Sequence, residues 1–171
     1  MSRVDGPLLV LGVGNVLLRD EGVGVRVVER LRSSPEPLPV GARIVDGGTL
    51  GLDLLPLIEE ARGLILVDAI DLQAAPGTVV ILRGRDVERA FGGHVSADQI
   101  GVGDLVSVCR LTDILPDELA LVGIQYAEIE VGRELSEPVL AALPAAVTAI
   151  REELRRMAAV TDAVGAGMAL P

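Results

Sequence analysis

The sequence predicts an α/β fold, a three-layer α/β/α sandwich around a five-stranded, mostly parallel sheet. Three observations favour this fold. Apolar runs alternate with amphipathic segments, 50% of the residues are hydrophobic, and the length of 171 residues suits one domain. We therefore expect a single domain over residues 1–160, followed by a Gly/Ala-rich, flexible tail over residues 161–171.

Five apolar runs bounded by Gly, Pro or an acidic residue indicate the strands, at residues 8–13, 42–46, 63–68, 78–82 and 119–124. The first and third runs are continuously apolar, which is typical of strands buried on both faces. The connection over residues 69–77 is short for a helical crossover. The fourth strand is therefore expected to run antiparallel, which makes the sheet mixed.

Apolar residues at helical spacing predict helices between these strands and one after the last of them. The first covers residues 23–31, with Asp20 as its N-cap. A short helix covers residues 52–61, and a long one rich in Ala, Leu and Arg covers residues 137–157. Another follows residues 96–99, Ser-Ala-Asp-Gln, which have the spacing of a capping box.

The composition excludes several classes of function. The chain has 25 acidic and 15 basic residues, a net charge of −10, so it repels phosphate backbones and anionic lipids. We therefore expect no nucleic-acid or membrane partner. All the basic residues are Arg, which excludes a phosphate-loop or Schiff-base lysine. No segment resembles a targeting signal, and we expect a cytoplasmic protein.

Two single residues also limit the chemistry. Cys109 is the one cysteine and lies within the apolar pattern of its helix, which favours a core position over a nucleophile. His94 is the one histidine and follows two glycines just before the capping box, so it is either a solvated loop residue or part of a site. Carboxylates must therefore carry most of any chemistry.

Acidic residues follow three of the predicted strands. Glu21 comes shortly after the first strand, Asp46 ends the second and Asp68 ends the third. In open α/β sheets ligands bind at the carboxyl ends of the strands, so these acids are expected to crowd one edge and to recruit a cation. The alternative is that each acid only caps a helix or a strand end.

The glycine-rich turn after the first strand does not fit a dinucleotide site. Gly12 and Gly14 are followed by Leu17 where the fingerprint has a small residue. Asp20 and Glu21 then stand at the helix start and would repel a pyrophosphate. We expect the glycines to permit a sharp turn beside the site, with no bound dinucleotide.

Three motifs together resemble the [NiFe]-hydrogenase maturation endopeptidases. They are GVGNVLLRDEGVGVR at residues 12–26, DGGTLG at residues 46–51 and LVDA at residues 66–69. The resemblance covers about residues 8–157. It implies a three-layer sandwich with a mixed five-stranded sheet, which agrees with the pattern of apolar runs.

The resemblance also implies a function. Members of the family remove a C-terminal peptide from the precursor of the hydrogenase large subunit after nickel has been inserted. Nickel already in the substrate is the recognised element. By motif match, Glu21 and Asp68 are metal ligands and catalytic residues, and Asp46 with Gly47, Gly48 and Thr49 recognises the substrate.

The sequence departs from the family at the third metal ligand. The family histidine stands in a Ser-x-His-x-x-Gly pattern, and Asp98 occupies its place in residues 96–101. Asp98 is the first candidate for the third ligand and catalytic residue, and His94 is the second. A carboxylate in place of imidazole makes the site harder and admits other divalent cations, manganese or magnesium. A weakened or specialised site is the remaining alternative.

These residues lead to a hypothesis of metal-assisted amide hydrolysis, because the chain lacks His-Glu-x-x-His and has no convincing nucleophile. Two alternatives stay open. The protein could be a non-catalytic, metal-sensing chaperone of the immature large subunit, or an unrelated binding protein for a small cationic ligand. No large apolar patch is evident in the sequence, so we expect a monomer that meets its substrate transiently.

Overall fold

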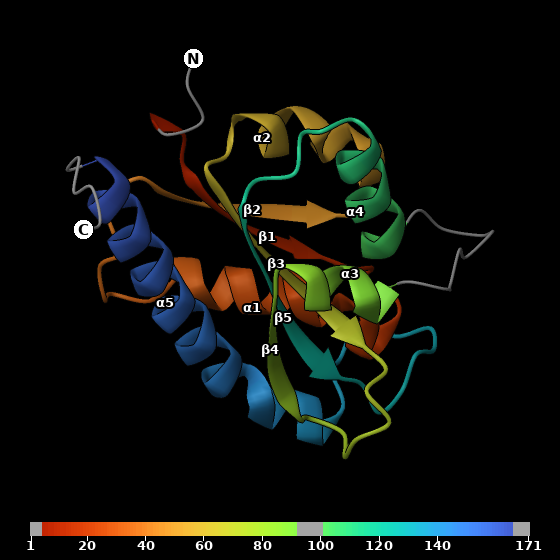
Figure 1. The fold of residues 1–171 in the computed structure, drawn as a ribbon. Helices are drawn as coiled ribbons and strands as arrows, with labels where there is room; N and C mark the ends of the chain where they lie inside the picture. Colours follow the sequence, from red (N-terminus) through yellow and green to blue (C-terminus); the bar gives the residue numbers. More distant parts are fainter. Residues whose placement is uncertain (1–4, 92–100, 166–171) are drawn as a thin grey trace.

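The computed structural model describes residues 5–91 and 101–165, with side chains as far as residue 160. Within these residues one mixed sheet has the strand order β2-β1-β3-β5-β4 (Figure 1). Its strands are β1 (Leu8–Val13), β2 (Ala42–Gly48), β3 (Gly63–Ile70), β4 (Val79–Arg83) and β5 (Glu118–Gln125). Only the β4–β5 pair is antiparallel, so the predicted mixed sheet is confirmed.

Helices cover both faces of the sheet, as the sequence predicts. Two pack on one face, α1 (Val23–Arg32) and α5 (Glu137–Gly165). Three pack on the other, α2 (Leu55–Glu60), α3 (Arg85–Phe91) and α4 (Val102–Leu111). No helix among the described residues is long and apolar enough to span a bilayer.

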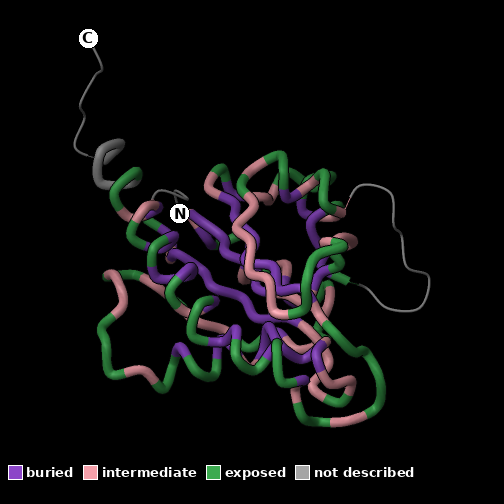
Figure 2. Tube along the Cα trace, turned by 90° about the horizontal axis from the view of Figure 1, so that it is seen from below, coloured by how far each residue is buried: buried purple, intermediate pink, exposed green. Residues whose placement is uncertain are grey.

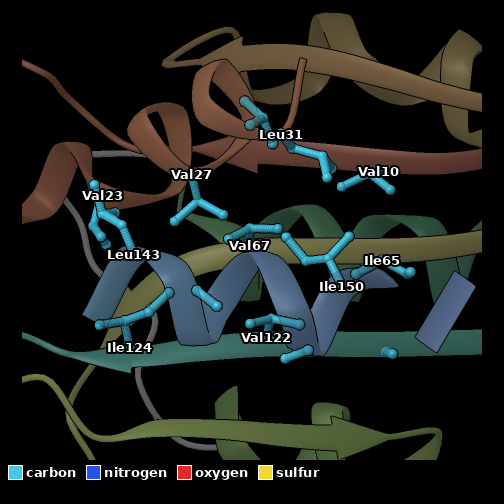
Figure 3. Packing of buried hydrophobic residues seen from close by; sticks show 14 of the residues in the cluster. Val10, Val23, Val27, Leu31, Ile65, Val67, Val122, Ile124, Leu143 and Ile150 are labelled. Carbon is cyan, nitrogen blue, oxygen red and sulfur yellow. The ribbon is translucent and has the colours of Figure 1, made fainter. Parts of the chain in front are cut away.

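Side chains that alternate along each central strand build the two cores. In β1, Leu8 and Val10 pack under α1 and α5, whereas Leu9 and Leu11 pack under the helices of the opposite face. Figure 3 shows the first core, where Val10 lies between the side chains of α1 and α5. Both faces of β1, β3 and β5 are therefore buried, and Figure 2 shows buried residues, in purple, gathered inside the molecule with exposed ones around them. This double burial explains the continuous apolar runs.

The structure corrects several predicted elements. Helix α3 was not predicted, because Val87 is its one fully buried apolar residue and its other positions are mostly polar. Helix α5 continues to Gly165, past the predicted end at Met157. The segment 52–61 divides into a 3-10 turn, Gly51–Leu54, and α2. The predicted capping box at residues 96–99 lies outside the described residues, and α4 begins at Val102.

The path of the chain creates a crevice between β1 and β3. From β1 the chain crosses over α1 to β2 on one side, then returns over α2 to β3 on the other side. The carboxyl ends of β1 and β3 thus lie where the connections diverge in opposite directions. Ligand sites of open α/β sheets form at such a point.

Candidate active site

A cavity of about 410 Å³ opens at this crevice. Its lining comes from the ends of β1, β2 and β3, the loops that follow them, and the start of α4. The polar side chains in the lining are Asn15, Glu21, Thr49 and Asp68. No basic side chain is present among the described residues that line it.

Two glycines place Glu21 over the ends of the strands. Gly14 has a φ of +131°, and a Cβ on it would overlap the carbonyl oxygen of Glu21. Gly24 lies in the first turn of α1, and a Cβ there would overlap the carbonyl oxygens of Val13 and Val67. Any side chain at either position would push the segment bearing Glu21 away from β1 and β3. Gly14 thus permits the sharp turn beside the site that the sequence predicts, and Gly24 adds a close backbone contact that it does not predict.

The carboxylate of Glu21 is poorly satisfied. Its Oε2 atom is buried and has no hydrogen-bond partner among the described residues. Burial accordingly raises the pKa of Glu21 above its usual range, since the charged form loses water and gains no donor. A buried acceptor without a partner is costly, so this oxygen points to a group that the protein alone does not supply.

Asp68, at the end of β3, lies in a similar environment. Burial raises the pKa of Asp68 well above its usual range, the backbone N–H of Ala69 opposes this with one hydrogen bond of 2.9 Å, and the charge of Glu21 raises the pKa further. The structure thus brings these two carboxylates within electrostatic range of each other. Two acids that disfavour each other's charge need a shared proton or a cation, and oxygen donors of this kind suit a divalent metal.

The residues of the second motif are divided between the cavity and the surface. Gly48 and Thr49 line the cavity. Asp46 is exposed and outside the lining, and its Oδ1 accepts a hydrogen bond of 3.0 Å from the N–H of Gly48. Gly47 is buried beside side chains of Leu11 and Leu54. Asp46 therefore shapes the turn that carries Gly48 and Thr49, and the expected crowding of three acids reduces to Glu21 and Asp68.

Both candidates for the third ligand, His94 and Asp98, lie outside the described residues. Within residues 5–91 and 101–160, no group of three His, Cys, Asp or Glu side chains is close enough to hold a metal ion. Cys109 is fully buried, and burial raises the pKa of its thiol to about 11, as expected of a core residue. Its prediction as a core residue is confirmed.

Asp20 does not cap α1, contrary to the sequence-based prediction. It lies in the 3-10 turn Arg19–Gly22 and is fully buried. Its carboxylate accepts hydrogen bonds from the N–H groups of Ala127, Glu128 and Ser136 and from the Ser136 hydroxyl, at 2.7–3.0 Å. Burial alone would raise the pKa of Asp20, but these bonds outweigh it and lower the pKa. Asp20 fixes the loop after β5 against the segment that carries Glu21.

Asn15 is a site residue that the sequence-based assignment missed. It lines the cavity, and its Oδ1 accepts a hydrogen bond of 2.9 Å from the N–H of Leu17. This bond closes the turn after β1. The signal was its position directly after Gly14, at the carboxyl end of a buried strand.

Known proteins share both the sequence and the fold. The chain matches the family described as hydrogenase maturation protease over residues 25–153. It is 42% identical over 150 residues to a hydrogenase expression/formation protein of Rhodobacter capsulatus, covering 86% of this chain and 71% of the relative. It is 40% identical over 149 residues to the hydrogenase 2 maturation protease of Escherichia coli K12, covering 86% and 90%.

A solved structure agrees with these relatives. The hydrogenase maturating endopeptidase HybD of E. coli superposes with a TM-score of 0.79 at 40% identity, covering 88% of this chain and 93% of that one. Fold and sequence thus define the class of protein as a protease. The chain belongs to the hydrogenase maturation protease family, as the three motifs indicated.

Proposed function

We propose that this protease removes the C-terminal peptide from the precursor of a [NiFe]-hydrogenase large subunit after nickel has been inserted. The observation that supports the proposal most directly is the pair Glu21 and Asp68. Both carboxylates line the cavity at the crevice between β1 and β3, and both have raised pKa values. No basic side chain neutralises them among the described residues that line the cavity. A cation bound in the substrate would satisfy both.

Nickel fits this arrangement as part of the substrate. Glu21 has a buried oxygen that no described residue satisfies, and Asp68 accepts one hydrogen bond from the N–H of Ala69. The two carboxylates would gain most from a precursor that carries a divalent metal and little from an empty one. The charge of the site thus offers a physical reason for cleavage to wait until nickel is inserted.

The proposed reaction is metal-assisted amide hydrolysis. The metal carried by the precursor would supply Lewis-acid polarisation of the scissile carbonyl or of a water molecule. Glu21 and Asp68 would bind that metal and fix its position against the cavity wall. Gly48 and Thr49 line the same cavity and would contact the polypeptide around it. Asp46 would act through the turn that carries them.

For the third ligand we propose Asp98, with His94 as the alternative. Asp98 stands at the position of the family histidine in the motif of residues 96–101. A carboxylate there would make all three ligands oxygen donors, which bind nickel with less discrimination against manganese and magnesium. Replacing each residue by Ala in turn would assign the ligand. The variant that lacks the true ligand should lose cleavage of a precursor that is only partly loaded with nickel.

Intact-mass spectrometry tests the proposed function. The large-subunit precursor from the same organism is loaded with nickel or left empty and incubated with the protein. We expect a loss of mass equal to a C-terminal peptide from the nickel-loaded precursor alone. Cleavage of both forms would refute the nickel dependence, and stable binding without any change of mass would favour the chaperone alternative.

A further inference from the structure

Exposed apolar side chains gather beside the cavity. Leu17, Ile129 and Val131 are 52%, 47% and 89% exposed, although each is a large hydrophobic residue. Leu17 follows two residues after Asn15, which lines the cavity, and the other two lie on the loop between β5 and α5. The sequence shows no large apolar patch here because Leu17 is far along the chain from Ile129 and Val131. Exposed apolar groups that the fold brings together are typical of an interaction site.

Backbone pairing places Leu17 beside Val131, and Ile129 lies two residues earlier on the same loop. Leu18 and Gly132 form a parallel bridge, in which Gly132 N–H donates to Leu17 O at 2.9 Å and Arg19 N–H donates to Gly132 O at 2.8 Å. Leu17 and Val131 each precede a residue of the bridge and therefore lie side by side. In Figure 1 this loop runs beside the start of α1.

The loop is held firmly despite having no helix or strand. Asp20 accepts its hydrogen bonds at both ends of the loop, from Ala127 and Glu128 and from Ser136. Arg19 forms ion pairs with Glu128 and Glu130 and donates to the carbonyl oxygen of Glu134 at 3.1 Å. The backbone that carries the exposed side chains is thus ordered before any partner arrives, which lowers the entropy lost on binding.

The charge around the three residues is acidic. The loop carries Glu128, Glu130 and Glu134 against Arg133, and Arg19 pairs with two of these acids, which leaves a net charge of −1. The whole chain has a net charge of −10. A partner that covers this surface should therefore combine apolar side chains with basic ones.

We propose that Leu17, Ile129 and Val131, together called the Leu17–Val131 surface, dock the large-subunit precursor through an apolar segment flanked by basic residues. The inference rests on the proposed function and adds the surface that recognises the polypeptide. A precursor whose metal enters the cavity passes next to Leu17, because the turn from Asn15 to Leu17 joins the cavity to this surface. The carboxylates bind the metal, and the Leu17–Val131 surface binds the polypeptide around it.

Steady-state cleavage of the nickel-loaded precursor tests the docking surface. For Val131→Asp and Ile129→Asp we expect KM to rise about tenfold or more with kcat unchanged, because an acidic group replaces an apolar contact away from the metal. Val40→Asp and Leu111→Asp are matched controls, since these residues are 96% and 85% exposed and lie outside the surface. Added salt should raise KM of the wild type, because it screens the acidic surface.

The outcomes separate this inference from the proposed function. If the wild type cleaves and both surface variants keep the KM of the controls, the docking surface is wrong and the function stands. If the wild type neither binds nor cleaves the precursor, both proposals fail. If sedimentation shows a wild-type dimer that Val131→Asp dissociates, the surface belongs to a second copy of this chain and the inference is overturned. Thermal melting of each variant verifies that the fold is retained.

Discussion

Glu153 lies at the end of the sheet where the parallel strands begin, and Glu21 and Asp68 lie at the end where they finish. Carboxylates are buried in both regions, but only Glu153 is paired with Arg side chains of the described residues. Glu153 is 1% exposed and accepts hydrogen bonds from Arg83 and Arg156, at 2.8–3.2 Å. Glu21 and Asp68 meet no cation among the described residues that line their cavity.

The pKa values follow this difference. Burial alone would raise the pKa of Glu153, but Arg83 and Arg156 outweigh it and hold the pKa below its usual range. Burial raises the pKa of both Glu21 and Asp68, and no described residue supplies a cation that reverses the shift. Paired burial therefore marks the structural carboxylate, and unpaired burial marks the two assigned to the site.

The largest expected effect comes from removing a charge at the site. For Glu21→Gln and Asp68→Asn we expect kcat/KM for the nickel-loaded precursor to fall by about 100-fold to 1,000-fold, as when one group stabilising a transition state is lost. The free energy of unfolding should stay the same or increase, because each variant removes a poorly solvated charge. A variant that cleaves at the wild-type rate would falsify the assignment.

Asp20→Ala should lower the stability of the protein, because Asp20 anchors the loop after β5. It leaves the N–H groups of Ala127, Glu128 and Ser136 without their acceptor, and we expect the free energy of unfolding to fall by about 3 kcal/mol. Asp86→Ala is the control, since Asp86 forms an exposed pair with Arg89 and should cost under about 0.5 kcal/mol. Urea denaturation measures both, and equal losses would contradict the anchoring role.

Glu153→Gln should destabilise the protein without affecting the site. The variant breaks the pairs with Arg83 and Arg156, for which we expect a loss of about 2 kcal/mol in the free energy of unfolding and an unchanged kcat/KM. Glu60→Gln is a matched control, because Glu60 is exposed and its contact with Arg43 is 4.0 Å long. A large loss of activity in Glu153→Gln would break the distinction between the two regions.

The smallest expected effect is a pH dependence of stability that belongs to Glu153. Its folded-state pKa lies below the unfolded value of about 4.5, so its stabilisation is complete above that pH and is lost as the pH falls further, through the folded-state pKa. Between pH 7 and pH 3 the wild type should thus lose more of its free energy of unfolding than Glu153→Gln does. Parallel losses, measured by denaturant titration at each pH, would show that Glu153 does not contribute.

Local patterns made much of the fold predictable. The strands were found from apolar runs, because burial on both faces leaves a signal within a few consecutive residues. Helix α3 left no such signal, since Val87 alone is fully buried on it. Of the three acids expected at the edge of the sheet, Glu21 and Asp68 line the cavity, whereas Asp46 accepts a hydrogen bond from Gly48 in its own loop.

The sequence by itself determined the sandwich, the antiparallel strand, the core position of Cys109 and the placement of Glu21 and Asp68 at strand ends. Only the tertiary structure decided which acids are paired. Asp20 and Glu21 are adjacent, yet Asp20 meets Ser136, 116 residues away, while the buried oxygen of Glu21 meets no donor within the described part of the chain. Hydrophobic periodicity is local and can be recognised along the chain. The partner of a buried charge depends on where distant loops return, which a single sequence does not reveal.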